Sequence, residues 1–229
     1  MSETVRTMFA TIAPRYDVSN TVLSLGIHHL WRRTVVRLSG AKAGMSVLDC
    51  ATGTGDLALA FKKAVGAEGK VLGTDFCAEM METAPDKATK RGMDISFEVA
   101  DAMNLHYPDN TFDIASISFG IRNVDVPAQA LREMARVVRP GGRVVVLEFG
   151  QPKGFMGALY RFYSNYVIPF VGGMLTGNRE AYSYLNRTAA KFPSGTDFND
   201  IMRETGMFAR TSYKSLTFGI AFVYVGEVR

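Results

Sequence analysis

Hydrophobic positions in the middle of the chain follow two alternating patterns. Short continuous apolar runs are typical of buried strands, whereas apolar residues at every third or fourth position are typical of helices. The first pattern predicts strands over residues 46–50, 69–75, 95–101, 112–119 and 141–149, and the second predicts helices over 56–65, 77–92 and 126–138. Strands and helices that alternate in this way indicate an α/β fold with a parallel sheet covered by helices on both faces.

The two flanks of the chain depart from this alternation. Residues 1–45 have helical spacing and include Trp31, and residues 151–195 are dense in aromatic residues and methionine. Near the C-terminus, two strands with a turn at Phe218 and Gly219 would close the sheet as an antiparallel hairpin. We therefore expect a single domain, residues 1–229. Its parts are a helical N-terminal leader (1–45), a cofactor-binding core (46–150), an aromatic lid or substrate insert (151–195) and a C-terminal helix and hairpin (196–229).

Composition narrows the class of protein. Hydrophobic residues make up 47% and charged residues 21% of the 229 residues, as in a folded soluble protein. No apolar run reaches the roughly 18 residues that a transmembrane helix needs, and the N-terminus lacks the apolar core of a secretory signal, so we expect a cytoplasmic protein. The net charge of +4 comes from dispersed lysines and arginines, which does not indicate a nucleic-acid partner.

Histidine and cysteine are too scattered to predict a metal centre. The three histidines and two cysteines show no metal-ligand spacing, so we expect no structural or catalytic metal. Cys50 and Cys77 are expected to be reduced, because disulfides are rare in the cytoplasm.

Acidic residues, glycines and a serine that could bind a ligand lie where the predicted strands end. Right-handed crossovers bring the carboxyl ends of parallel strands to one edge of the sheet, and ligands bind at that edge. Glycines in a loop there let a ligand approach the backbone closely. The residues that the pattern brings to this edge are Asp49, Gly53, Gly55, Asp75, Asp101 and Ser118.

Two classes of cofactor fit parts of this edge. The run from Gly53 to Ala58 matches a loose dinucleotide fingerprint, with Asp75 following about 20 residues later, which would suit a nicotinamide cofactor. Asp49, however, would repel a pyrophosphate and would attract a cationic amine or sulfonium. Asp101 and Ala102 end a further strand, where they could meet an adenine. These features favour a sulfonium cofactor, and an NAD-dependent oxidoreductase or a non-catalytic binding scaffold remain the alternatives.

The whole arrangement resembles the class I S-adenosylmethionine-dependent methyltransferases. Three stretches are similar to signatures of the ubiquinone/menaquinone-biosynthesis C-methyltransferase family: YDVSNTVLSLGIHHLWR (16–32), SFGIRNV (118–124) and RVVRPGGRVVVLEF (136–149). The resemblance covers essentially the whole chain. It departs from the family pattern at Ser19, where methionine is usual, at Ala51, where many relatives have glycine, and at Asp101, where either Asp or Asn occurs.

This resemblance implies a Rossmann-like fold, with a seven-stranded, mostly parallel sheet, an antiparallel C-terminal hairpin and helical lid elements. It also implies S-adenosyl-L-methionine as the cofactor. Thr54 would lie in the cofactor loop, Asp75 on the ribose hydroxyls, Asp101 with Ala102 at the adenine, and Ser118 near the methionine end. Asp49, Gly53 and Gly55 complete the expected cofactor-binding set.

The implied reaction is methyl transfer from sulfur to a ring carbon of a prenylated quinol. Demethylmenaquinol is the preferred acceptor, and the benzoquinol of the ubiquinone pathway, or both, is the alternative. Arg122, Asn123 and Tyr16 are the candidate catalytic residues. Arg122 could stabilise a phenolate or form a structural salt bridge, and Tyr16 could hydrogen-bond the quinol or pack the lid.

Several residues near these candidates have simpler interpretations. Asp17 and Asn20 would cap a helix, and His28 would serve packing or surface roles. The aromatic insert would either cover the core or form an apolar groove for the prenyl tail. We expect that it could also make a peripheral contact with the inner face of the membrane, or form a homodimer interface.

Overall fold

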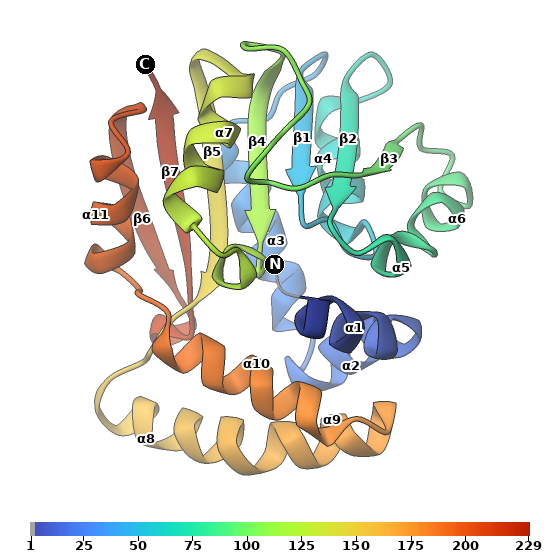
Figure 1. Cartoon of the computed structure of the whole chain (residues 1–229), viewed down its shortest axis with the longest axis vertical. Coiled ribbons are helices and arrows are strands. Elements are labelled where there is room, and N and C mark those ends of the chain that lie inside the picture. Colours follow the sequence, from blue (N-terminus) through green and yellow to red (C-terminus); the bar gives the residue numbers. More distant parts are fainter. Residues whose placement is uncertain (1–2) are drawn as a thin grey trace.

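The computed structural model describes residues 3–229, except for the side chains of residues 3–6, 14 and 179. A seven-stranded sheet runs through the molecule in the order β3-β2-β1-β4-β5-β7-β6 (Figure 1). Its strands are β1 (Ser46–Cys50), β2 (Lys70–Asp75), β3 (Ser96–Val99), β4 (Phe112–Ser118), β5 (Val138–Phe149), β6 (Phe208–Leu216) and β7 (Ala221–Val228). The first five are parallel, and β7 pairs antiparallel with both β5 and β6. The expected parallel sheet with a closing hairpin is therefore confirmed.

Helices cover both faces of this sheet. Helices α3 (Ile27–Ser39) and α4 (Asp56–Val65) pack on one face, and α7 (Pro127–Val137) and α11 (Thr196–Glu204) pack on the other. Successive residues of β1 point to opposite faces, as the strand geometry requires: Val47 joins the core under α3 and α4, and Leu48 joins the core under α7 and α11. Burial on both faces explains why the strands read as continuous apolar runs.

A third layer of helices lies beyond the carboxyl ends of the parallel strands (Figure 1). It consists of α1 (Glu3–Ile12), η1 (Ala13–Arg15), α2 (Tyr16–Leu23), α8 (Gly154–Phe162), the π-helical turn η3 (Tyr163–Val167), α9 (Ile168–Thr176) and α10 (Arg179–Lys191). The N-terminal and the aromatic segments meet here, because α2 contacts α9 and α1 contacts α10. None of the helices within residues 3–229 has the length and apolar content needed to cross a lipid bilayer.

One predicted helix is wrong. Residues 77–92 form two short helices, α5 (Ala78–Met81) and α6 (Ala84–Thr89), instead of one. Pro85 lies in the first turn of α6. Proline has no N–H to bond to the preceding turn and its ring clashes there, so the chain restarts a helix at this point.

Cys50 and Cys77 are both buried, and neither forms a disulfide. Burial raises the pKa of Cys50 to about 12 and that of Cys77 to about 11, so both are protonated at neutral pH. Within the described residues, no group of three His, Cys, Asp or Glu side chains is arranged to hold a metal ion.

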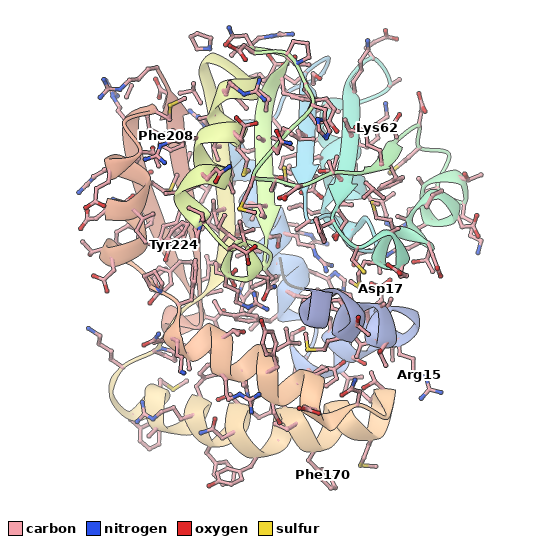
Figure 2. All side chains as sticks on the ribbon, viewed as in Figure 1. Arg15, Asp17, Lys62, Phe170, Phe208 and Tyr224 are labelled. Carbon is pink, nitrogen blue, oxygen red and sulfur yellow. The ribbon has the colours of Figure 1, made fainter. Side chains whose placement is uncertain are left out.

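The C-terminal hairpin is fixed to the rest of the domain by Tyr224, which Figure 2 labels on β7. This side chain is 1% exposed, and its ring packs edge-on against Phe198 of α11, with ring centroids 4.6 Å apart. Its hydroxyl oxygen accepts a hydrogen bond of 2.7 Å from the buried backbone N–H of Gly195, just before α11 begins. One residue thus connects strand and helix by apolar contact and by a hydrogen bond.

Replacing Tyr224 by Phe is expected to lower the free energy of unfolding by about 1–3 kcal/mol, because the N–H of Gly195 then remains buried without an acceptor. The control is Tyr213→Phe on β6, whose hydroxyl bonds Thr196 at an exposed position; it should cost no more than about 0.5 kcal/mol. Urea unfolding of both variants measures the difference, and equal losses would contradict the role given to Tyr224.

Candidate active site

Two adjoining cavities open at the carboxyl edge of the sheet. The larger has a volume of ≈ 310 Å³ and the smaller ≈ 80 Å³. The lining residues that they share lie after β1, at and just after the end of β4, and at one position of the leader. The shared residues are Tyr16, Ala51, Gly53, Ser118 and Phe119. A ligand that occupied both cavities would therefore pass along the loop after β1, where the glycines were predicted to lie.

Asp75 is held in the smaller cavity by backbone hydrogen bonds. It ends β2 and is 9% exposed, and its two carboxylate oxygens accept bonds from the N–H of Gly53 (2.9 Å) and of Cys77 (3.0 Å). Burial raises the pKa of Asp75, and the hydrogen bonds from these N–H groups limit the rise. Each carboxylate oxygen keeps a lone pair for a further donor, so this group can accept a pair of hydroxyls.

Asp101 and Ala102, which we expected at an adenine, line the same smaller cavity as Asp75. The carboxylate of Asp101 accepts a bond of 2.9 Å from the N–H of Met103, which orients it after β3. Asn123 also lines this cavity and does not line the larger one. Its Oδ1 is buried with no partner in the described chain. The structure thus separates Asn123 from Arg122, although the sequence placed them side by side as catalytic candidates.

Asp49 lines the larger cavity beside the glycine loop. It is 1% exposed and accepts hydrogen bonds from the hydroxyls of Ser116 (2.6 Å) and Thr52 (2.8 Å). Burial raises the pKa of Asp49 to about 6, and both hydroxyls act against that rise. At neutral pH this group is mostly a carboxylate next to the cavity, which suits a cationic ligand.

Thr54 connects the cofactor loop to the leader. Its hydroxyl donates to Asp17 on α2 (2.5 Å), and the other oxygen of Asp17 pairs with Lys87 of α6 (2.7 Å). Lys87 also pairs with Asp56 (2.6 Å), which in turn pairs with Arg32 of α3 (2.7 Å). The interpretation of Asp17 as a helix cap is therefore wrong, because its carboxylate holds the leader against the loop and α6. Figure 2 labels Asp17 at this junction.

Gly55 serves packing, and it lines neither cavity. Its φ is +79°, a conformation that residues with a Cβ rarely adopt. A Cβ at this position would lie 3.0 Å from Ala84 and 3.1 Å from the ring of Phe97. Gly55 thus lets α4 begin close to its neighbours. Gly53, by contrast, lines both cavities and donates its N–H to Asp75.

Arg122 forms a buried ion pair at the wall of the larger cavity. Its guanidinium lies 2.6 Å from Glu148, donates to the carbonyl of Phe119 (2.7 Å) and stacks over the ring of Phe149 at 5.4 Å. The two charged side chains are only 4% and 1% exposed. The salt-bridge interpretation of Arg122 is therefore correct, but Nε remains buried without a partner in the described residues. A ligand in the cavity can meet this cation.

Aromatic side chains form much of the remaining wall of the larger cavity. From the insert, Tyr160, Tyr163 and Tyr182 line it, and Tyr163 also donates its hydroxyl to the carbonyl of Leu23 (2.8 Å). Burial raises the pKa of Tyr160 to about 12 and also raises that of Tyr16, so neither is a base at neutral pH. The insert thus does both things that the sequence left open, since it covers the core and lines a mostly apolar cavity.

Sequence reasoning missed two residues of this cavity region, Glu148 and Asn186, and gave a third, His28, only packing or surface roles. Glu148 neutralises Arg122, and His28 and Asn186 line the cavity. Burial lowers the pKa of His28 to about 4, and Ser24 bonds its Nδ1 (2.5 Å). Glu148 could have been found, because it lies near the end of β5 at the same carboxyl edge. Asn186 has no comparable signal, because it depends on how α10 packs.

Comparison with known proteins gives a consistent result. The model of the ubiE/COQ5 methyltransferase family matches residues 1–227. The ubiquinone/menaquinone biosynthesis C-methyltransferase UbiE of Bdellovibrio bacteriovorus is 58% identical over 99% of this chain and 97% of its own length. The demethylmenaquinone methyltransferase of Thermus thermophilus is 47% identical over 96% of this chain and 99% of its own length. The demethylmenaquinone methyltransferase of Deinococcus radiodurans is 44% identical over 99% of this chain and 93% of its own length.

Solved structures support the fold assignment. A SAM-dependent methyltransferase of Thermotoga maritima, described as a possible histamine N-methyltransferase, superposes with a TM-score of 0.69 at 20% identity, covering 98% of this chain and 100% of the other. A SAM-dependent methyltransferase of Aquifex aeolicus gives 0.63 at 22% identity, covering 86% and 89%. The sheet is thus that of the class I methyltransferases, and the match to the family model argues against the nicotinamide alternative. The chain belongs to the ubiE/COQ5 methyltransferase family and is an S-adenosylmethionine-dependent C-methyltransferase.

Proposed function

We propose that the protein methylates a ring carbon of a prenylated quinol, with demethylmenaquinol as the preferred acceptor. The observation that carries this proposal is the larger cavity, which combines a mostly apolar wall that is rich in aromatic side chains with the buried cation of Arg122. An aromatic wall suits a flat ring with an apolar tail, and a cation suits an oxygen that gains negative charge. The relatives named demethylmenaquinone methyltransferase support this acceptor, and the relative named for both pathways keeps a ubiquinone-pathway benzoquinol as the alternative.

The donor groups of the site fit S-adenosylmethionine. When bound, this cofactor supplies a methyl group activated by a sulfonium. We propose that Asp75 accepts the ribose hydroxyls, that Asp101 and Ala102 meet the adenine, and that the Asp49 carboxylate attracts the cationic methionine end. Thr54, Gly53 and Ser118 line the cavity walls in between, as members of the loop after β1 and of the end of β4.

On the acceptor side, the proposed role of Arg122 is electrostatic. A ring carbon becomes a better nucleophile when the adjacent phenol gains phenolate character, and a fixed cation favours that change. A guanidinium does not deprotonate in proteins, so Arg122 cannot itself be the base. Tyr16 lines both cavities and can donate a hydrogen bond to the quinol oxygen. Aligning donor and acceptor in this way can supply roughly 7–11 kcal/mol of barrier reduction.

The chemistry of the acceptor has a consequence for location. A prenylated quinol resides in the lipid bilayer, and the protein must reach it there. We therefore propose that the enzyme works at the inner, cytoplasmic face of the membrane as a peripheral protein, with homodimer formation as the competing use of its aromatic insert.

The assignment of Asp75 can be tested by cofactor binding. Asp75→Ala should weaken the binding of S-adenosylhomocysteine at least tenfold, because two charge-assisted hydrogen bonds are lost. Asp94→Asn, an exposed change on the loop before β3, is the control and should bind normally. Isothermal titration calorimetry gives both values, and full affinity in Asp75→Ala would remove this residue from the ribose site.

The role of Asp49 predicts a pH dependence. With a pKa of about 6, this group loses its charge as the pH falls from 7 to 5, so the affinity for S-adenosylmethionine should fall roughly tenfold over that range. The effect of pH on the stability of the free protein runs in the opposite direction. Because the pKa of Asp49 is higher in the folded than in the unfolded chain, folding takes up protons between about pH 4 and 6, and the stability contribution of Asp49 declines as the pH rises through that window.

Asp49→Asn carries no charge at any of these pH values and is the matched variant. Its cofactor affinity should be low and nearly independent of pH between 5 and 7. Calorimetric titrations at pH 5, 6 and 7 compare it with the parent protein. A parent affinity that does not change with pH would rule out Asp49 as the group that attracts the cationic end.

Arg122 must be tested together with Glu148, because removing one member of a buried ion pair leaves the other charge unpaired and costs about 3–5 kcal/mol. The double variant Arg122→Met, Glu148→Gln avoids this cost. It should bind S-adenosylhomocysteine normally and lose at least tenfold in turnover. Glu148→Gln alone bears the stability cost of the unpaired cation, but its folded fraction keeps that cation, so the turnover per folded molecule should stay near that of the parent protein.

The assay is methyl transfer to short-chain, water-soluble naphthoquinol and benzoquinol acceptors. The ratio of the two rates also decides between the two proposed substrates. Normal turnover in the double variant would assign Arg122 a purely structural role, and no methylation of either quinol by the parent protein would refute the proposed function.

A further inference from the structure

An apolar ridge runs along the outer face of the insert. The segment from α8 through η3 to α9, residues 154–176, is one continuous helical run that places every third or fourth residue on the same side. Six large apolar side chains on that side are 53% to 83% exposed. They are Phe155, Leu159, Phe162, Tyr166, Phe170 and Met174. Figure 2 labels Phe170, which projects away from the body of the molecule at the edge of the lid.

The opposite side of the same helical run faces the site. Tyr160, Tyr163 and Ile168 line the larger cavity, so a single helix thickness separates the cavity from the ridge. A helix that covers a core usually has a polar outer face. This run is apolar on both sides, which is typical of a helix with a second apolar neighbour. Six aligned apolar side chains also exceed the single, scattered ones that are normal on a protein surface.

The charges around the ridge fit an anionic surface. From residue 151 to residue 178 the chain contains no aspartate or glutamate, and its only charged residues, Lys153 and Arg161, are exposed and basic. At the far end of the ridge, Arg15 of the leader is also exposed and donates to the carbonyl of Leu175 (2.7 Å). Basic residues that border an apolar helix face favour the interface of a bilayer with anionic lipid headgroups.

The ridge continues to the mouth of the larger cavity. Helix α2, which contacts α9, exposes Val18 and Val22, and Leu25 follows at 86% exposure. Leu25 also lines the larger cavity. Exposed apolar side chains therefore lie on α2, which packs against α9, and at the larger cavity itself; together they offer an apolar ligand a route to the cavity.

We propose that the apolar ridge lies on an anionic phospholipid bilayer, with its aromatic side chains in the boundary between headgroups and acyl chains and with Lys153, Arg161 and Arg15 on the phosphates. This inference deepens the proposed function, on which its biological purpose rests, by assigning the surface that meets the membrane. In this orientation the cavity mouth beside Leu25 faces the lipid, and the acceptor enters from the bilayer.

The experiment is cosedimentation of the full chain with large unilamellar vesicles. Vesicles of phosphatidylglycerol and phosphatidylethanolamine should bind the protein at least tenfold more tightly than vesicles of phosphatidylcholine, and the difference should shrink with added salt. The variant Phe162→Glu, Phe170→Glu places two acids on the ridge and lines neither cavity. It should lose at least tenfold in binding to the anionic vesicles.

Val126→Glu is the control, since Val126 is 48% exposed and precedes α7, outside the ridge; it should bind vesicles like the parent protein. The ridge variant should also retain its affinity for S-adenosylhomocysteine and its turnover of a water-soluble quinol, which separates this proposal from the proposed function. Light scattering gives the oligomeric state. Unchanged vesicle binding by the ridge variant overturns the proposal, and so does a parent dimer that the variant converts to monomers.

Discussion

The site depends on the requirement that buried carboxylates be hydrogen-bonded. Asp49 lies one residue before the end of β1 and Asp75 ends the neighbouring β2. Both are almost fully buried, and a charge in that position is tolerated only when donors surround it. Hydroxyls of Thr52 and Ser116 serve the first, and the N–H groups of Gly53 and Cys77 serve the second. These bonds fix the loop between β1 and α4, and the shape of the loop in turn fixes where the two cavities meet.

The sequence predicted what depends on local periodicity and on strand order. All seven strands, helix α4 and the edge that holds Asp75 and Asp101 follow from those two signals. The failures have specific physical causes. Pro85 divides a helix that the apolar spacing joined. Asp17 bonds residues 37 and 70 positions away, which no local rule for helix caps contains. Such long-range contacts are set by packing of the third helical layer.

The ion pair between Arg122 and Glu148 changes how the acceptor side should be understood. A lone buried cation would attract any anion, whereas a pair that is 4% and 1% exposed is nearly neutral from a distance. The pair can therefore attract only groups that come close to the Nε atom of Arg122, which has no hydrogen-bond partner within the described residues. For the proposed function, this means that a neutral, apolar ring can enter the cavity and that charge developing on one of its oxygens can still be stabilised.

The leader makes the proposed cofactor site depend on a segment outside the core. Phe9 and Tyr16 form part of the wall of the smaller cavity, which Asp75 and Asp101 also line. Asp17 of the same segment bonds Thr54 in the loop after β1 and Lys87 of α6. A defect in the packing of the leader should therefore resemble a defect in cofactor binding, although the altered residue lies far from Asp75 in the sequence.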